Sequence, residues 1–276
     1  MDKPGTLWVV ATPIGNLEDF SARGQRVLRE VALIAAEDTR HSKPLLAHFG
    51  IGTPLAALHE HNEREAIAPL LARLEAGDDV ALISDAGTPL ISDPGFRLVR
   101  AVREAGHRIN TVPGACAAIA ALSVAGLPSD RFVFEGFLPA KASARRARLR
   151  ELAHEPRTLV FYESAHRIWE CCEDMRDTLG AQREARLLRE LTKLYETALG
   201  DTLDAICARL DADGNQQRGE FVLIVAGAGE ATDDKVVEGR RVYALLRQEL
   251  PPAQAAKLAA AISGAPRRAL YEGGGG

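Results

Sequence analysis

Short apolar runs alternate with helix-like segments in the first half of the chain. Four such runs, apolar rather than alternating, lie at residues 6–11, 31–35, 79–83 and 108–112. Continuous apolar character is typical of strands that are buried on both faces of a sheet. A helix is expected after Asn62, where Glu65 follows three residues later as in a capping box. Strands that alternate with helices predict a mostly parallel sheet with right-handed crossovers.

The second half repeats this theme with a different pattern. Five strands are predicted, at residues 131–137, 157–162, 185–189, 195–199 and 219–226. A helix after Ser164 carries apolar residues at helical spacing, namely Ile168, Cys172, Met175 and Leu179. Two further helices, 236–250 and 253–262, are expected on either side of Pro251-Pro252. The sequence therefore predicts an α/β fold of two α/β domains followed by a small helical extension.

The domain boundary is expected near residues 113–125, where a helix would connect the two halves. We expect an N-terminal domain over 1–117, a C-terminal α/β domain over 118–229 and the helical extension over 230–276. The four glycines at 273–276 are expected to form a disordered tail.

Composition excludes several classes of protein. The 276 residues are 46% hydrophobic and 26% charged, as in soluble globular proteins. The sequence contains no apolar run of about 18 residues, so no membrane span is predicted. It also has no basic region followed by an apolar core at its start, so no secretory signal is predicted. The four cysteines form no C-x-x-C pair, so we expect reduced thiols in a cytoplasmic protein without structural zinc.

A ligand site is predicted where the first four strands end. Loops at Pro13, Glu37, Asp85 and Pro113 each follow a buried strand, and ligands of open parallel sheets bind outside the carboxyl ends of the strands. The alternative is that these Gly and Pro residues only make turns. The loop 84–95 contains neither common phosphate-binding glycine motif. An organic ligand fits it better, with Gly87 allowing close approach and Asp85 accepting hydrogen bonds.

Six motifs in this order resemble one family, the bacterial small-subunit ribosomal RNA methyltransferase I enzymes of the tetrapyrrole-methylase-like class. They are TPIGNLED at 12–19, AEDTR at 36–40, SDAGTPLISDPG at 84–95, FVFEGFLP at 132–139, FYES at 161–164 and RELTK at 189–193. The resemblance covers residues 6–227. It implies a fold of tetrapyrrole-methylase type, S-adenosylmethionine as cofactor, and 2′-O-methylation of a cytidine ribose in the decoding region of 16S rRNA. It also implies a homodimer with the cofactor between two domains.

Site residues follow from the matched motifs. The resemblance implies cofactor contacts from Pro13, Ser84, Asp85, Gly87, Cys116, Ala117, Tyr162 and Leu191. Cys116 stands where the family usually has Ser, so only backbone N–H groups are expected to bind there. Methyl transfer to a hydroxyl also needs orientation and proton removal. The candidate catalytic residues are Glu37, which ends a buried strand at the predicted crevice, and then Glu163 and Lys193.

Substrate contacts are expected from basic side chains. Arg40 and His41 are candidates for phosphate or ribose contacts, because a guanidinium matches a phosphate bidentately. His166 is a further candidate, and can also be considered as a base. With a net charge of −4, RNA binding requires a local basic patch. The run from Lys141 to Arg150 supplies one through Arg145, Arg146 and Arg148, although such runs are usually solvated helix faces.

Two other functions stay open at this stage. One is methylation of a small tetrapyrrole, because the same architecture supports that chemistry. The other is a non-catalytic, ribosome-associated binding module that would have no affinity for the cofactor. A metal site formed by Glu37, Asp38, Asp85 and Asp93 also stays open, but their spacing does not support one, so no metal is predicted.

Overall fold

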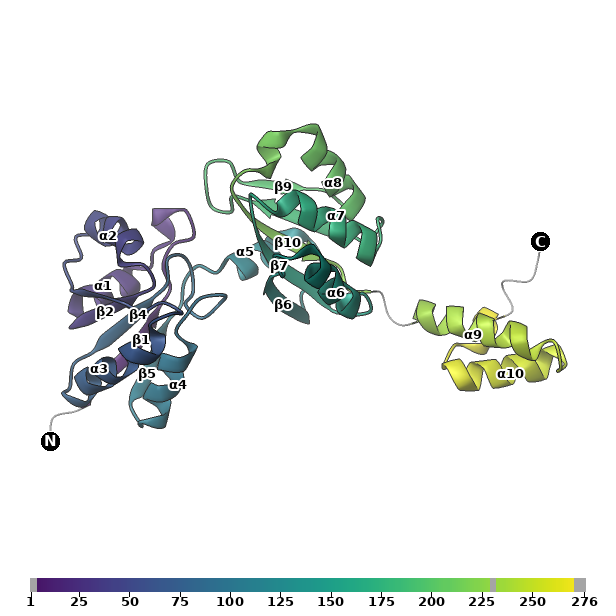
Figure 1. Cartoon of the computed structure of the whole chain (residues 1–276), viewed down its shortest axis with the longest axis horizontal. Helices are drawn as coiled ribbons and strands as arrows, with labels where there is room; N and C mark the ends of the chain where they lie inside the picture. Colours follow the sequence, from purple (N-terminus) through teal and green to yellow (C-terminus); the bar gives the residue numbers. More distant parts are fainter. Residues whose placement is uncertain (1–3, 229–231, 271–276) are drawn as a thin grey trace.

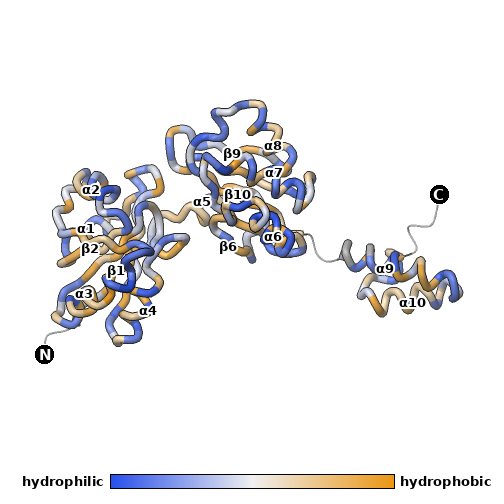
Figure 2. Tube along the Cα trace, in the orientation of Figure 1, coloured by the Kyte–Doolittle hydropathy of each residue, from blue (hydrophilic) through white to orange (hydrophobic). Residues whose placement is uncertain are grey.

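The structure, a computed structural model, describes residues 4–228 and 232–270. Two α/β domains lie side by side and a helical pair stands apart from them at the C-terminal end (Figure 1). Helix α5 (Ala117–Ala125) connects the two domains. Its residues are apolar almost throughout, as its colour in Figure 2 shows. The predicted fold class, with a mostly parallel first sheet and a C-terminal helical extension, is confirmed.

The first sheet is fully parallel. Its strands are β1 (Thr6–Val10), β2 (Leu33–Ala36), β3 (Leu55–Ala57), β4 (Val80–Ile83) and β5 (Arg108–Val112), in the spatial order β3-β2-β4-β1-β5. Successive strand residues face opposite sides, so each face has its own apolar cluster. One cluster packs against α1 (Ala22–Glu30) and α2 (Thr39–His48), and the other packs against α3 (Glu63–Glu75) and α4 (Phe96–Glu104). A short helix, η1, spans Leu17–Asp19.

The second sheet is mixed. It contains β6 (Phe132–Phe137), β7 (Thr158–Ser164), β8 (Ala185–Arg189), β9 (Thr197–Leu199) and β10 (Glu220–Val225), in the order β6-β7-β10-β8-β9. Only the β6–β7 pair is parallel among these described strands. Helices α6 (Ala142–Leu152), α7 (Ile168–Leu179) and α8 (Leu203–Ala212) cover one face, and η2 (Gly214–Gln217) follows α8. Helix α5 covers part of the other face.

The apolar spacing after Ser164 predicts the buried side of α7 correctly. Ile168, Cys172, Met175 and Leu179 all lie in the core between this helix and the second sheet. Cys171 and Cys207 join the same core, and all four cysteines of the chain are free thiols. The expectation of unpaired cysteines therefore agrees with the structure.

The predicted capping box at Asn62 is wrong, because the expected hydrogen bond from its side chain to the helix is not formed. Asn62 is the N-cap residue of α3, but its side chain makes no bond to the helix. Its Oδ1 instead accepts from His59 N at 2.8 Å and its Nδ2 donates to Ala57 O at 3.0 Å, which closes the turn after β3. The neighbouring Glu63 is buried and caps a different helix, because its Oε1 accepts from Arg97 N and Leu98 N at the start of α4.

The C-terminal pair consists of α9 (Thr232–Leu246), α10 (Pro252–Ser263) and the short helix η3 (Arg267–Leu270). Pro251 and Pro252 separate the two long helices as expected, since proline fits the start of a helix. The core of the pair is built from its own side chains, Val242, Ala259, Ala265 and Leu270. The predicted glycine tail at 273–276 lies outside the described residues. Within the described ranges, no helix has the length and apolar character that crossing a bilayer requires.

Candidate active site

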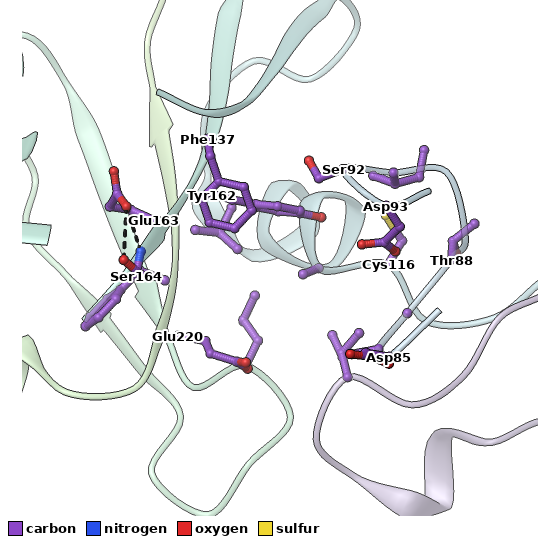
Figure 3. Close-up of a pocket in the computed structure, with 18 of the residues that line it drawn as sticks. Asp85, Thr88, Ser92, Asp93, Cys116, Phe137, Tyr162, Glu163, Ser164 and Glu220 are labelled. Atoms are coloured by element: carbon purple, nitrogen blue, oxygen red, sulfur yellow. Dashed lines mark hydrogen bonds between the residues drawn. The ribbon is translucent and has the colours of Figure 1, made fainter. Parts of the chain in front are cut away.

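A cavity of about 340 Å³ lies between the two α/β domains (Figure 3). The first domain contributes residues from the loops that follow β1, β2 and β4, such as Ile14, Glu37 and Asp85. The second contributes Tyr162 and Val222 from the sheet face that α5 partly covers. Cys116 and Ala117, which follow the Pro113 loop after β5, complete the wall at the start of α5. The structure thus brings residues from all four predicted loops to one place.

The position of the cavity follows from the topology of the first sheet. The chain leaves β4 toward α4 on one face, whereas it leaves both neighbours, β1 and β2, toward α1 and α2 on the opposite face. The loops therefore diverge on both sides of β4, and such a switch point leaves a crevice at the carboxyl edge of a parallel sheet. The β4 loop, residues 84–95, stands in that crevice.

Left-handed backbone conformations shape the β4 loop. Gly87 has a φ of +78°, and its N–H and C=O pair with Thr12 at 3.1 and 2.9 Å, which joins this loop to the β1 loop. Leu90 and Ser92 also have positive φ, 74° and 69°, which is uncommon for residues with a Cβ. These turns fold the loop back on itself, so that both ends, Asp85 and Asp93, face the cavity.

Three carboxylates converge on the first-domain side of the cavity. Asp85 Oδ1 accepts a hydrogen bond from Asp38 N at 3.0 Å, and Glu37 Oε2 accepts one from Asp85 N at 3.4 Å. Burial raises the pKa of Glu37, and the nearby Asp85 charge adds to this although its backbone N–H opposes it. Burial raises the pKa of Asp93 to about 6, and the charges of Glu37 and Asp85 reinforce the shift. Removal from water and the repulsion of neighbouring negative charges both raise the pKa of a carboxyl group.

Tyr162 links the second domain to the start of α5. Its hydroxyl oxygen accepts a hydrogen bond from Ala118 N at 3.0 Å, which satisfies one of the N–H groups that the first turn of a helix leaves unpaired. Cys116, the N-cap residue, makes no such side-chain bond. Burial, together with the adjacent Cys116 thiol, raises the pKa of Tyr162 far above its usual value, so the phenol stays neutral.

The predicted bases Glu163 and Lys193 are both engaged with other groups. Glu163 borders the cavity, but its buried carboxylate accepts from Ser164 N at 2.8 Å and lies 3.2 Å from Arg167 Nη2. Lys193 Nζ donates to Glu190 at 2.9 Å and to Glu220 at 2.7 Å. Burial alone would lower its pKa, yet these two hydrogen bonds outweigh burial and raise it. Lys193 is therefore protonated at neutral pH, which does not suit a base.

The remaining predicted cofactor residues divide into two groups. Asp85, Gly87, Cys116, Ala117, Tyr162 and Leu191 line the cavity. Pro13 and Ser84 do not line it; both are buried next to lining residues, so they shape the loops that form the wall. Residues not predicted as part of the site also line it, among them Ile14, Thr88, Ser92, Asp93, Phe137 and Glu220. The SDAGTPLISDPG motif contains Asp93, but its linear order does not reveal that the loop doubles back.

The predicted substrate residues lie outside the cavity. Arg40, His41 and His166 are exposed. Arg40 already forms a bidentate pair with Asp38, with nitrogen–oxygen distances of 3.1 and 2.7 Å. This pair holds the pKa of Asp38 well below its usual range.

The basic run in α6 differs from the expected free patch. Arg145 is buried, 1% exposed, and Nε donates to Asp174 Oδ2 at 2.6 Å, so its guanidinium is turned into the protein. The physical reason is helical spacing, which places Arg145 on the same face as the core residues Leu149 and Leu152. Arg146 shares Asp174 at 3.1 Å and Arg148 pairs with Glu135 at 2.8 Å, but both stay partly exposed.

Acidic side chains dominate the polar lining. Glu37, Asp85, Asp93, Glu163 and Glu220 border the cavity, and no Lys, Arg or His does so among the described residues. No cluster of three His, Cys, Asp or Glu residues with metal-binding geometry occurs in the part of the chain that the structure describes. The cavity therefore favours a ligand with positive charge and disfavours one that presents phosphates.

Comparison with family models assigns both parts of the chain. Residues 6–207 match the model of the Tetrapyrrole (Corrin/Porphyrin) Methylases, and residues 233–273 match a model described as the RsmI C-terminal HTH domain. Among solved structures, uroporphyrin-III C-methyltransferase from Thermus thermophilus complexed with S-adenosyl homocysteine is 19% identical, with a TM-score of 0.54 over 83% of this chain and 99% of that one. The methyltransferase CobJ is 21% identical, with a TM-score of 0.60 over 81% and 95%. These structures show a shared fold.

Sequence relatives match over nearly the whole length. A protein of Xylella fastidiosa strain Temecula1 is 60% identical over 99% of this chain and 100% of its own. Proteins of Pseudomonas aeruginosa and Escherichia coli O157:H7 are 60% and 53% identical, each over 97% of this chain and over 96% and 94% of their own lengths. All three carry the name ribosomal RNA small subunit methyltransferase I. The chain therefore belongs to the ribosomal RNA small subunit methyltransferase I family, within the tetrapyrrole methylases.

Proposed function

We propose that this chain transfers a methyl group to the ribose 2′-hydroxyl of a cytidine in the decoding region of 16S rRNA. The general activity, methylation of ribosomal RNA with S-adenosylmethionine as the donor, follows from membership of the family. The atom and the nucleotide rest on the motif resemblance. The observation that carries the proposal is the acidic cavity between the domains, at the switch point of the first sheet.

The residues of the cavity fit S-adenosylmethionine. The volume of about 340 Å³ lies within the usual range for ligand pockets, roughly 300–1,000 Å³. The molecule carries a positive sulfonium, a positive ammonium and one carboxylate, but no phosphate. Glu163 and Glu220 are paired with Arg167 and Lys193, which leaves the three carboxylates of the first domain to suit the positive groups. Ile14, Leu191 and Val222 supply apolar walls for its uncharged parts. Asp85, Gly87, Tyr162 and the backbone at Cys116 and Ala117 are the proposed contacts.

The cofactor supplies an activated methyl group when bound. The chain must then hold the ribose hydroxyl in line with that group, keep water out and accept a proton. Such positioning can supply roughly 7–11 kcal/mol of a reaction barrier. Ile14 from the first domain and Phe137 from the second are apolar residues in the cavity wall. Because Glu163 and Lys193 are engaged elsewhere, Glu37 is the stronger of the predicted bases.

The RNA phosphates are expected to stay outside this acidic cavity. Arg40, His41 and His166, which are exposed beyond its lining, keep their place as proposed RNA contacts. Arg146 and Arg148 are the members of the basic run that we propose to face RNA. The homodimer, the small subunit as partner and the cytoplasmic location are proposed from the motif resemblance alone.

The test is labelled methyl transfer, preceded by calorimetry with S-adenosylmethionine. Purified chain, labelled cofactor and either assembled small subunits or naked 16S rRNA are combined, and the modified position is mapped by nuclease digestion and mass spectrometry. We expect label on a cytidine ribose of the decoding region. Label on a base, on another RNA or on an added tetrapyrrole would contradict the proposal. A chain that shows no affinity for the cofactor would instead favour a binding module.

A further inference from the structure

Phe137, the last residue of β6, combines a place in the cavity wall with an exposed ring. It lines the cavity between the two domains, and Figure 3 shows its side chain beside that of Tyr162. The two ring centroids are 5.7 Å apart and the ring planes meet at 67°, which is an edge-to-face contact. Phe137 is nevertheless 54% exposed. More than half of a large apolar residue at the edge of the site thus stays open to solvent.

A β-bulge in β6 turns Phe137 toward the cavity. Phe134 pairs with Val160 and Phe137 pairs with Tyr162, so residues three apart on β6 oppose residues two apart on β7. Side chains alternate along a regular strand, which would place residues 134 and 137 on opposite faces of the sheet. The bulge brings them to the same face, where both rings contact Tyr162. Bulges often re-aim a side chain next to an active site in this way.

The backbone on both sides of Phe137 is held in place. Gly136 before it has a φ of +64°, and a Cβ there would lie 2.9 Å from a side chain of the β4 loop, so the position favours glycine. Leu138 after it is buried, and its carbonyl oxygen accepts a hydrogen bond from Arg167 Nη2 at 2.6 Å. The same nitrogen lies 3.2 Å from the buried Glu163 carboxylate. The exposed ring therefore stands on a fixed backbone, which lowers the entropy cost of binding a ligand against it.

We propose that the base of the target cytidine stacks on Phe137, an assignment that rests on the proposed function. RNA-binding proteins recognise unpaired nucleotides by stacking their bases on aromatic side chains. An uncharged base can enter beside the acidic cavity, whereas RNA phosphates are repelled by it. With its base on Phe137, the target nucleotide presents its ribose toward the cavity. The ring then determines which nucleotide offers its hydroxyl to the methyl group.

The adenine of the cofactor is the other planar group in the proposed reaction. The exposure of Phe137 favours the RNA base, because the cofactor is proposed to bind inside the cavity while the RNA approaches from solvent. The two ligands are distinguished by measuring cofactor affinity and RNA methylation in the same variants.

The first experiment compares Phe137→Ala, Phe137→Leu and Phe137→Trp with Phe132→Ala in the full chain. Phe132 is a matched control, because it begins the same strand, is 37% exposed and does not line the cavity. Stacking is worth about 1–3 kcal/mol per base, so Phe137→Ala should lower kcat/KM for RNA about 5–150-fold. Phe137→Leu should be similarly slow although it keeps the apolar bulk, whereas Phe137→Trp and Phe132→Ala should stay close to the wild type. Calorimetry should give the wild-type affinity for S-adenosylmethionine in all four variants.

A substrate without the target base tests the contact directly. The 16S rRNA is prepared by ligation with an abasic ribose at the mapped position, in whichever form, naked or assembled, the wild type methylates. Loss of the base should slow the wild-type chain about as much as Phe137→Ala does. On the abasic RNA, Phe137→Ala should cost little more, because the same contact cannot be lost twice. An equal effect of Phe137→Ala on both substrates would show that the ring does not contact this base.

The remaining outcomes separate this proposal from the proposed function. A wild-type chain that binds cofactor but leaves RNA unmodified contradicts the function before any variant is compared. With an active wild type, the assignment fails if Phe137→Ala weakens cofactor binding as much as it lowers kcat/KM, because the ring would then hold the cofactor. It also fails if Phe137→Leu is as active as the wild type. A change of oligomeric state in Phe137→Ala, seen by size-exclusion chromatography, would overturn it too, since the ring would then contact another copy of the chain.

Discussion

Asp93 is partly buried beside Glu37 and Asp85, so its ionisation costs the folded protein free energy. The unfolded chain pays no such penalty, because its carboxylates are separated and hydrated. The folded protein therefore binds the Asp93 proton more tightly than the unfolded chain does. Its contribution to stability falls as the pH rises from about 4 to about 6, and the penalty is complete above that window.

Replacement of Asp93 by Asn should therefore stabilise the cofactor-free protein at high pH. A shift from 3.8 to about 6 corresponds to at most about 3 kcal/mol, so we expect a gain of up to that size at pH 8. At pH 4 the gain should vanish, because the aspartate is then protonated as well. Urea unfolding of both proteins at the two pH values measures this difference. An equal effect at pH 4 and pH 8 would show that the cause is not the charge.

Arg145 is expected to stabilise the fold rather than to bind RNA. It is buried and its closest acidic partner is Asp174 at 2.6 Å, with Glu170 farther away at 3.5 Å. Removing the acid leaves a buried positive charge with poor compensation. Asp174→Ala should therefore lower the free energy of unfolding by about 3–5 kcal/mol. Denaturant titration checks this value.

Arg146 provides the matched control, because it contacts the same carboxylate from a side chain that is 45% exposed. Exposed ion pairs contribute about 0–1 kcal/mol, so Arg146→Ala should hardly change the unfolding transition. If the Arg146 and Asp174 variants lose the same stability, burial of Arg145 is not what makes its ion pair important.

At the scale of elements, Gly87 joins the β4 loop to the cavity wall. Gly87 adopts a φ of +78°, and a Cβ there would lie 3.0 Å from Ile14 Cγ2 in the β1 loop. Gly106, between α4 and β5, has nearly the same φ, +79°, but a Cβ there would meet no atom within 4 Å. The two positions therefore share the same backbone strain and differ in their contact with the cavity.

Alanine at either position should cost about 1–2 kcal/mol of stability, because a residue with a Cβ is strained in the left-handed region. Only Gly87→Ala should also weaken cofactor binding, since it forces Ile14 and the β1 loop away from their positions in the cavity wall. Thermal unfolding and calorimetry with S-adenosylmethionine test both effects. A Gly106→Ala protein with equally weakened binding would show that general destabilisation is the cause.

The sequence predicts best those elements in which several buried apolar residues recur at regular spacing. The strand at 79–83 and the buried side of α7 are clear because several apolar residues in succession must face a core. The sequence does not predict strand β3. This strand has only three residues and none of them is fully buried, so its hydrophobic pattern is too short to recognise. The sequence misleads at Arg145 because tertiary folding brings its partner, Asp174, from 29 residues away. It misleads at Asn62 because that side chain binds the backbone of the preceding turn instead of the helix.

The same distinction applies to the site. The end of a buried strand marks Glu37 and Asp85, and these do line the cavity. Asp93, Phe137 and Glu220 reach it through a loop reversal or from the second domain, and neither leaves a local signal in the sequence. Conversely, Lys193 stands in a matched motif, but two carboxylates that no pattern places beside it engage its ammonium.

At the scale of the whole molecule, the two α/β domains form one site. The Lys193 stem lies directly over Gly15, so that a Cβ there would be 2.5 Å from Lys193 Cγ, and Tyr162 caps the helix that connects the domains. The C-terminal helical pair has its own core and contributes no described residue to the cavity. It matches the model of the RsmI C-terminal HTH domain, and because helix-turn-helix domains can bind nucleic acid, we propose that the pair binds RNA and not the cofactor.

Deletion of residues 229–276 should therefore separate these two roles. We expect the shortened chain to keep the unfolding transition of the two α/β domains and the wild-type affinity for S-adenosylmethionine, because the cavity lies entirely within residues 14–222. The KM for RNA should rise while kcat changes less, since a helix pair that only binds RNA affects association more than the transfer step. Calorimetry and steady-state transfer to 16S rRNA measure these quantities. If cofactor affinity falls together with RNA affinity, the helical pair supports the active site directly; if neither changes, it does not bind the substrate.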